Sequence, residues 1–204
     1  MISVNIGHIC LILEEIMSNY NKILESGKSV FTKKDLEKIL YLNTKWALDK
    51  FLYREKNKGF LINLSHGIYT LKKFDILELA SKIRKKSYLS LETVLKKHWV
   101  IFQYYDDIFL ISDDTIQRKV WNINFRFNKI KDSILLNQLG LEHKGSYTIA
   151  SKERAICDRI YLSKNYYFDD LSEIDFGKLR EISEIYKNKR VSSEVNKLIK
   201  QYAE

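Results

Sequence analysis

The chain of 204 residues contains no proline, two cysteines and four histidines. Cys10 and Cys157 lie far apart in the sequence, and neither belongs to a CxxC pair. Structural zinc sites and disulfide frameworks need several cysteines or histidines at short spacings. We therefore expect neither kind of site, and we expect Cys157 to be a buried thiol in the reducing cytoplasm.

Long uninterrupted apolar runs are missing as well. The apolar stretch near the N-terminus, HICLILEEIM, contains Glu14 and Glu15, and no basic segment precedes it. A membrane span needs about 20 apolar residues, and a secretory signal begins with basic residues. The pattern instead predicts an amphipathic helix over residues 8–26 of a cytoplasmic protein.

Most catalytic motifs are also missing, because the sequence has no glycine-rich phosphate loop, no nucleophile–base pair and no kinase signature. One enzymatic alternative stays open. Asp132, Glu142 and Lys144 follow the D…ExK order of metal-dependent nucleases, in which carboxylates hold the cation and lysine stabilises charge at phosphorus. That order arises by chance in chains rich in lysine and glutamate, and the flanks lack the apolar strand expected behind such a site. We predict that the chain is not an enzyme and binds no cofactor or metal.

Positive charge is what the chain has in excess, with 35 lysines and arginines, 26 acidic residues and a formal net charge of +9. Residues 28–75 contain eleven basic and five acidic residues, and residues 76–131 contain eleven and six. Residues 132–204 are neutral. A basic surface of this kind favours a polyanionic partner such as nucleic acid.

Three helices followed by a hairpin are predicted over the first 73 residues. Thr32 suits the N-cap of the second helix, with Asp35 in the capping-box position. Asn43 or Thr44 suits the N-cap of the third helix, KWALDKFLYREKNK. The stretch GFLINLSHGIYTLKK alternates apolar and polar residues on both sides of a turn at Gly67, which is typical of a β-hairpin. This order of elements predicts a winged helix-turn-helix domain, residues 1–75, that binds duplex DNA.

The third helix is the predicted recognition helix. A helical wheel places Trp46, Asp49, Lys50 and Tyr53 opposite the apolar side, so they face the major groove. Asp49 would accept a hydrogen bond from a cytosine amino group. Two alternatives stay open: Trp46 packs against a second domain, or the charged face is only solvated. The predicted DNA-contacting residues are Lys33, Lys34, Thr44, Lys45, Trp46, Asp49, Lys50, Tyr53, Arg54, His66 and Lys72.

A second domain of the α+β class is predicted for residues 76–204, with one small, mostly antiparallel sheet and surrounding helices. Two N-caps stand out, Ser90 and Ser151, each before a helical pattern. The expected elements are a helix in DILELASKIRKK, a helix after Ser90, strands at 108–112 and 119–131, a strand pair broken at Gly140 and Gly145, a helix after Ser151, and helices near 171–187 and 192–203.

A group of basic residues crowds the beginning of this domain. It could extend a DNA footprint, dock an acidic partner or RNA, or form an ordinary solvated helix face. Its members are Lys82, Arg84, Lys85, Lys86, Lys96 and Lys97.

Three segments, taken in order, resemble the AbiEi-type antitoxins of bacterial abortive-infection and type IV toxin–antitoxin systems. HGIYTL is similar to the return strand of that family's wing, SYLSLETVLKKHWVI to the start of its C-terminal domain, and IASKERAICDRIYL to a helix with a Glu-(Lys/Arg)-Ala core and a following Asp. The chain departs from the family at Lys152, where a proline is expected, and at Trp99, where a glycine often follows the histidine.

The resemblance implies two functions. The winged helix would bind inverted repeats in the promoter of its own operon and repress it. The C-terminal domain would neutralise a nucleotidyltransferase-like toxin encoded alongside, with or without a stable complex. A plain transcriptional regulator, whose second domain senses a ligand or partner, is the main alternative.

Overall fold

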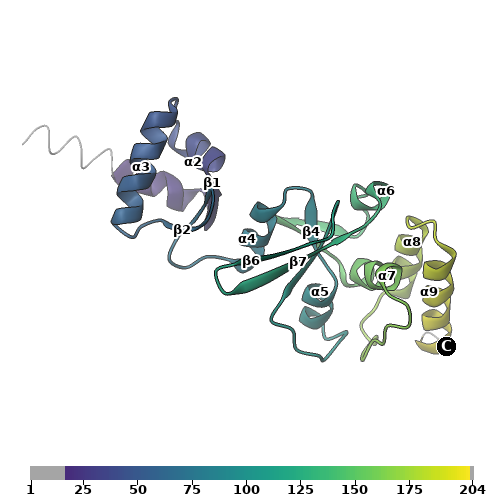
Figure 1. The fold of residues 1–204 in the computed structure, drawn as a ribbon. Helices are drawn as coiled ribbons and strands as arrows, with labels where there is room; N and C mark the ends of the chain where they lie inside the picture. Colours follow the sequence, from purple (N-terminus) through teal and green to yellow (C-terminus); the bar gives the residue numbers. More distant parts are fainter. Residues whose placement is uncertain (1–16, 203–204) are drawn as a thin grey trace, which may run out of the picture. The chain divides into compact units, whose positions relative to one another are not determined.

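The computed structural model describes residues 17–202, and the chain divides into two compact units, Met1–Asp75 and Ile76–Glu204. Residues 17–25 are helical, in agreement with the C-terminal part of the helix predicted from the sequence. The beginning of that predicted helix, with Cys10, lies outside the described residues. The protein is of the α+β class, and each unit has its own sheet (Figure 1).

The first unit packs its helices against a three-stranded antiparallel sheet in which β3 lies between β1 and β2. The core contains Ile23 from the first helix, Leu36, Leu48 and Phe51 from the two following helices, and Phe31 from the sheet. The elements after residue 25 are β1 (Val30–Thr32), α2 (Lys33–Leu40), α3 (Lys45–Asn57), β2 (Ile62–Ser65) and β3 (Ile68–Thr70).

Both helix starts predicted in this unit are confirmed. The Thr32 hydroxyl accepts from the amide of Asp35, and the Asp35 carboxylate accepts from the amide of Thr32 at 2.9 Å. The Thr44 hydroxyl accepts from the amide of Ala47, so Thr44 and not Asn43 is the N-cap of α3. These bonds satisfy amide groups that have no partner within the helix.

The hairpin is present, and it joins a strand that the sequence did not predict. Gly67 takes a φ of +74° in the turn between β2 and β3, a conformation that glycine adopts without strain. The additional strand, β1, is only three residues long and pairs with β3. The hairpin is thereby built into a sheet that shares the core of the helices, with β3 as its central strand.

The second unit contains a six-stranded sheet in the order β6-β7-β5-β4-β9-β8. The sheet is mixed, and most of its strand pairs are antiparallel, as the sequence predicts. The pairs β5–β7 and β4–β9 are parallel, and the other three pairs are antiparallel. Strand β7 lies between β6 and β5, so that β7 is antiparallel to β6 and parallel to β5. Strands β4 and β9 can be parallel because a long connection separates them in the sequence. The strands are β4 (Ser87–Leu89), β5 (Ile108–Ser112), β6 (Ile116–Val120), β7 (Ile123–Lys129), β8 (Leu141–Lys144) and β9 (Tyr147–Ala150).

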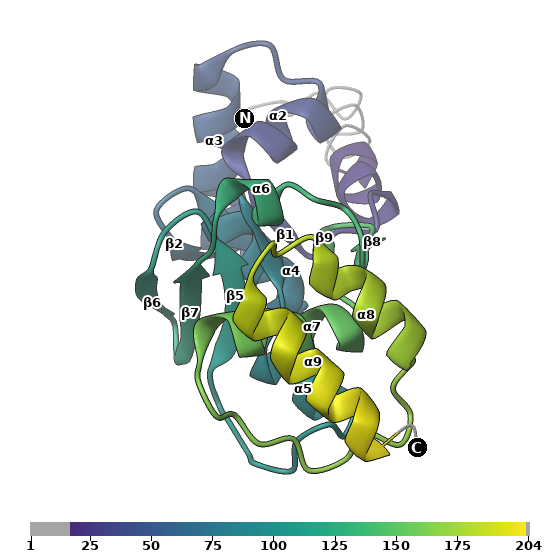
Figure 2. The same cartoon turned by 90° about the vertical axis from the view of Figure 1, so that its right-hand side faces the viewer.

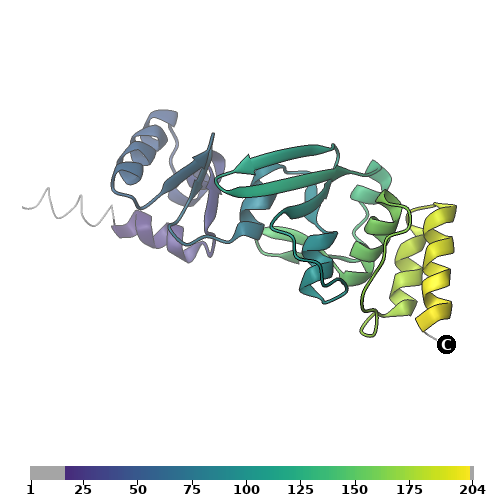
Figure 3. The same ribbon diagram turned by 60° about the horizontal axis from the view of Figure 1, so that its bottom comes forward.

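The helices of this unit pack around the sheet, and the predicted cap of α7 by Ser151 is confirmed. Helix α7 contacts α5 and β9 as well as the C-terminal pair α8 and α9 (Figures 2 and 3). No helix within the described residues has both the length and the apolar character needed to cross a membrane. The helices are α4 (Ile76–Ile83), α5 (Glu92–Lys97), α6 (Asp132–Leu135), α7 (Lys152–Leu162), α8 (Phe176–Glu184) and α9 (Lys189–Tyr202).

The strand predicted over residues 119–131 is in fact the end of one strand and the whole of the next. The chain reverses at Trp121 and Asn122, so that Val120 pairs with Ile123. Trp121 takes a left-handed φ of +54° in this turn. The turn was missed because it contains no glycine, and because apolar residues alternate with polar ones straight through it.

The prediction that Ser90 caps a helix is wrong. Leu91 is the N-cap of α5, with a φ of +53° and no side-chain capping bond. Ser90 is fully buried, and its hydroxyl donates to the carboxylate of Asp158 at 2.7 Å. A local cap motif was therefore overridden by a partner 68 residues away.

Candidate functional site

Helix α3 has one buried side and one exposed side. Leu48, Phe51 and Leu52 lie in the core, whereas Trp46 and Tyr53 are 71% and 72% exposed. Lys45, Asp49 and Lys50 are exposed as well. The exposed side of α3, residues 45, 46, 49, 50 and 53, therefore combines two lysines, one carboxylate and two aromatic rings on a rigid helix.

Asp49 and Lys33 form an ion pair across helices α3 and α2. The Lys33 ammonium donates to the Asp49 carboxylate at 2.7 Å. This hydrogen bond lowers the pKa of Asp49 and raises the pKa of Lys33, so both groups stay charged at neutral pH. Lys33 and Asp49 therefore neutralise each other, and neither acts as an independent charge at this surface.

Lys50 and Trp46 lie together on the exposed side of α3. The Lys50 ammonium is 4.9 Å from the centre of the Trp46 ring, a cation–π distance. Because both side chains are exposed, the ammonium keeps its access to a ligand. Within its own unit the Trp46 side chain is not packed into the core, because it is 71% exposed.

Arg54 serves the interior of the first unit. Its guanidinium donates to the carboxylate of Glu55 at 2.6 Å, and Glu55 is fully buried. The Tyr20 hydroxyl donates to the other oxygen of the same carboxylate at 2.5 Å. Burial, followed by the bond to Glu55, raises the pKa of Tyr20 to about 12. Arg54 therefore compensates a buried charge, although its side chain is still 37% exposed.

The eleven residues predicted to contact DNA thus fall into two groups. Lys33, Asp49, Arg54 and the Thr44 hydroxyl are engaged by neighbours within the unit. The others present exposed side chains on α2, on α3 and beside the hairpin: Lys34, Lys45, Trp46, Lys50, Tyr53, His66 and Lys72.

The basic group at the start of the second unit is partly neutralised. The Arg84 guanidinium donates to the Asp113 carboxylate at 2.6 Å, which lowers the pKa of Asp113, and it lies 3.7 Å from Asp114. The Lys96 ammonium lies 3.7 Å from the centre of the Tyr104 ring. Within this group, the exposed lysines are Lys85, Lys86 and Lys97, whereas Lys82 is half-buried.

The D…ExK residues lie on two different elements, β8 and α6. Glu142 and Lys144 pair with each other on β8 at 2.9 Å, and Asp132 is the first residue of α6. Within residues 17–202, no group of three or more histidine, cysteine, aspartate or glutamate side chains could hold a metal ion. The geometry gives no support to a nuclease centre at these residues.

A buried polar cluster in the second unit was not recognised as such from the sequence. Arg154 and Asp158, one turn apart on α7, are both 0% exposed, with the guanidinium 3.6 Å from the carboxylate. Asp158 also accepts hydrogen bonds from Tyr88, Ser90 and Tyr186. Burial raises the pKa of both tyrosines, and the nearby Asp158 charge raises them further. Since its members are buried and come from the sheet and the helices, the cluster fastens the two together.

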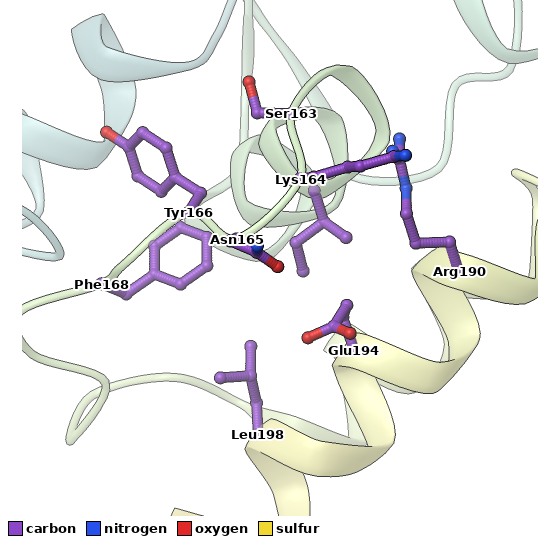
Figure 4. Close-up of a pocket in the computed structure, with 9 residues that line it drawn as sticks. Ser163, Lys164, Asn165, Tyr166, Phe168, Arg190, Glu194 and Leu198 are labelled. Carbon is purple, nitrogen blue, oxygen red and sulfur yellow. The ribbon is translucent and has the colours of Figure 1, made fainter.

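A cavity of about 150 Å³ lies between the segment after α7 and helix α9 (Figure 4). Arg190 at its edge donates to the carbonyl of Tyr161, and Glu194 and Leu198 follow on the same helix. Small-molecule sites usually enclose about 300–1,000 Å³. We therefore assign no ligand to this cavity.

The surface of the described residues that best fits a functional role is the exposed side of α3 with the neighbouring lysines of α2 and the hairpin. Its cations suit a polyanion, and its aromatic rings suit contact with sugars or bases. Neither a family model nor a curated protein matches the chain.

Proposed function

We propose that the protein is a DNA-binding repressor that also acts as an antitoxin, as its resemblance to the AbiEi-type antitoxins implies. The observation that carries the DNA-binding part is the exposed side of α3, where Lys45, Trp46, Lys50 and Tyr53 project from a helix anchored by its opposite side. The order helix, β1, α2, α3, β2 and β3 supports the winged helix-turn-helix of this proposal. In this proposal α3 is the recognition helix and the β2–β3 hairpin is the wing.

In this proposal, the chemistry of each side chain decides whether it contacts a phosphate, a base or a sugar. Lys34 on α2, Lys45 at the start of α3 and Lys72 beside the hairpin neutralise phosphates and fix the orientation on the duplex. Lys50, in the middle of α3, reaches the guanine edge in the major groove. Trp46 provides an apolar contact, for which a thymine methyl group or a sugar is suitable.

The DNA-binding proposal is tested with a labelled 40-base-pair duplex taken from the region directly upstream of the protein's own coding sequence. Lys45→Ala/Lys50→Ala should weaken binding by roughly 2–4 kcal/mol, since each lost contact to a base or phosphate costs about 1–2 kcal/mol. Lys144→Ala, on the exposed strand β8, is the matched control and should bind as the wild type does. Unchanged affinity of the double variant would remove α3 from the recognition role.

The antitoxin part of the proposal assigns neutralisation of a toxin to the second unit. The toxin is a nucleotidyltransferase-like protein encoded by the adjacent gene. Expression of that gene alone should arrest growth, and co-expression of the present chain should restore it. The Lys45→Ala/Lys50→Ala variant should still restore growth while losing repression of a promoter reporter. Growth arrest that persists with the wild-type chain would leave only the regulator function.

A further inference from the structure

The hairpin formed by β6 and β7, here called the β6–β7 ribbon (residues 116–129), lies at one edge of the six-stranded sheet. Three consecutive side chains on β6 are exposed: Gln117, Arg118 and Lys119. Successive side chains on a strand point to opposite faces, so this part of β6 is open to solvent on both of its faces. Val120 and Phe125 remain buried, and they anchor the ribbon to the core.

The charge of this segment is of one sign. Residues 115–131 contain five basic residues and no acidic residue. Arg126 pairs with the Asp107 carboxylate just before β5. Within residues 17–202, no carboxylate pairs with Arg118 or Lys119. The ribbon therefore keeps a local excess of positive charge that nothing in its own unit neutralises by a direct pair.

The register of the ribbon gathers hydrogen-bonding side chains on its outer face. Lys119 lies opposite Asn124, and Gln117 lies opposite Arg126. Side chains of directly opposed residues project on the same face of an antiparallel pair. Trp121 stands at the tip, 63% exposed. Asn124 and Arg126 both donate to the Asp107 carboxylate, so Gln117 and Lys119 supply the groups that this face offers to a ligand. Amide, ammonium and indole groups are among those with which proteins contact phosphates, sugars and bases.

Lysines on an edge strand also prevent the sheets of different molecules from pairing. Protection of the edge is therefore an alternative explanation for Lys119. The opposite edge of the same sheet shows what that protection looks like here. On β8, Glu142 and Lys144 form an ion pair at 2.9 Å, so their charges cancel. The β6 edge carries cations without carboxylates, which edge protection alone also uses, and an exposed tryptophan at its tip, which edge protection does not require.

We propose that the β6–β7 ribbon is a second DNA-binding element, located in the unit that the proposed function reserves for the toxin. The partner is a DNA duplex, because the major groove of B-form DNA is about 12 Å wide and admits a two-stranded ribbon. The major groove of duplex RNA is too narrow for side chains to read. The ribbon supplies Arg118 and Lys119 to phosphates and places Trp121 against the sugar–base surface. The proposal shares its ligand with the proposed function of α3, but it depends on different residues.

The first test measures the salt dependence of binding of the full-length protein to a labelled 30-base-pair duplex of random sequence. Each phosphate contact contributes about 0.9 to the slope of log K against log salt concentration. Arg118→Ala/Lys119→Ala should reduce the steepness of the slope by about 1.8 and the affinity at 0.1 M salt by roughly 10- to 100-fold. Lys144→Ala on the opposite edge is the control. It should leave both the slope and the affinity close to those of the wild type. An unchanged slope in the ribbon variant overturns the proposal.

The second test locates the contact directly. A photo-crosslinking benzoylphenylalanine replaces Trp121, or, as the control, the similarly exposed Leu136, which is 64% exposed. Irradiation of the complex should join the duplex to position 121 and not to position 136. If duplex DNA remains bound but position 121 gives no crosslink, the ribbon is not a DNA contact. Stronger competition by a duplex RNA than by the same DNA sequence would overturn the choice of ligand.

The outcome for the ribbon can be separated from the outcome for α3. If Arg118→Ala/Lys119→Ala binds as the wild type does and Lys45→Ala/Lys50→Ala is impaired, the ribbon proposal is wrong and the recognition role of α3 is supported. If the ribbon variant is impaired and the α3 variant is not, the second unit contains the main DNA site and the proposed function of α3 is wrong. Impairment of both variants supports both assignments.

Discussion

At the scale of single residues, the ion pair between Asp49 and Lys33 changes what each can do. The sequence placed Asp49 among the groove-facing residues, and the structure pairs its carboxylate with the Lys33 ammonium at 2.7 Å. The bond keeps the pKa of Asp49 below its usual range, so the carboxylate stays charged down to acidic pH. Asp49 therefore withholds one lysine from the phosphates as long as the pair persists.

Replacing Asp49 by alanine should strengthen DNA binding. The change releases Lys33 and removes a negative charge that a nearby phosphate would repel. We expect the slope of log K against log salt to become steeper by about one contact and the affinity at 0.1 M salt to rise roughly fivefold or more. Fluorescence anisotropy with the promoter and random duplexes measures both quantities.

Weaker DNA binding by Asp49→Ala would contradict this prediction. If Asp49→Ala weakens binding to the promoter duplex and leaves binding to the random duplex unchanged, Asp49 accepts a hydrogen bond from a base. The double variant Lys33→Ala/Asp49→Ala is the control, because it removes the pair without releasing a lysine. Its affinity should stay close to that of the wild type.

Arg54 shows that an exposed cation need not belong to the binding surface. Its guanidinium donates to the buried carboxylate of Glu55. Arg54→Ala should therefore lower the free energy of unfolding by about 1–3 kcal/mol, because a buried acceptor loses its charged donor. Urea unfolding followed by circular dichroism measures the change, with exposed Lys58→Ala as the control. A stable Arg54→Ala protein with weak DNA binding would return Arg54 to the recognition surface.

At the scale of elements, two glycines with positive φ lie at the two ends of strand β8, and their surroundings differ. Gly140, with φ +74°, precedes β8, and a Cβ there would lie 2.8 Å from Ile182 Cδ1 and 3.0 Å from Arg154 Cβ. Gly145, with φ +58°, lies in the β8–β9 turn, and a Cβ there would meet nothing within 4 Å. Both glycines take a positive φ, which strains any other residue. Of the two, only Gly140 also lacks room for a Cβ atom.

This difference predicts unequal effects of the same substitution. Gly145→Ala should cost about 1–2 kcal/mol in the free energy of unfolding, the strain of a left-handed alanine. Gly140→Ala should cost about 1–3 kcal/mol more, since the core between α7 and α8 must shift to admit the methyl group. Thermal and urea unfolding of both variants compares them directly. Equal losses would show that strain dominates and that the contacts around Gly140 give way easily.

Elements fixed by near neighbours could be predicted from the sequence. The N-caps at Thr32, Thr44 and Ser151 depend on bonds to amides three residues away, and all are present. Elements that depend on distant partners could not. Ser90 has the residue type of a cap, but its hydroxyl is bound by Asp158. Likewise β1, three residues long, forms only because β3 offers its edge.

In the candidate site too, local features could be predicted from the sequence and contacts between distant residues could not. The wheel of α3 correctly separated its buried side from its exposed side, because helical periodicity alone decides it. The ion pairs that engage Lys33 and Arg54 were not foreseen, since they depend on how neighbouring side chains meet. The β6–β7 ribbon was missed because its turn, Trp121 and Asn122, contains no glycine, and because apolar residues alternate with polar ones through it.

At the scale of the whole molecule, the positive charge is distributed over two units that each contribute exposed cations. The net charge is +9, and the excess lies within residues 28–131. Unit one offers the lysines near α3, and unit two offers the ribbon. Affinity for duplex DNA should therefore come mainly from the release of counterions.

This distribution predicts a steep response to salt for the intact protein. With about six phosphate contacts, the slope of log K against log salt should be near −5, and affinity should fall roughly 1,000-fold between 0.05 M and 0.2 M salt. Titrations at four salt concentrations with the random duplex give the slope. A slope shallower than −2 would show that few of these cations meet phosphates.

One carboxylate joins three parts of the second unit that are far apart in the sequence. Tyr88 and Ser90 approach Asp158 from the end of β4, and Tyr186 approaches it from the segment after α8. A stop codon before Tyr186 would delete α9 and also remove the 2.6 Å hydrogen bond that holds this carboxylate. Late nonsense mutations should therefore behave as complete losses of the second unit and, if the proposed function is correct, of toxin neutralisation.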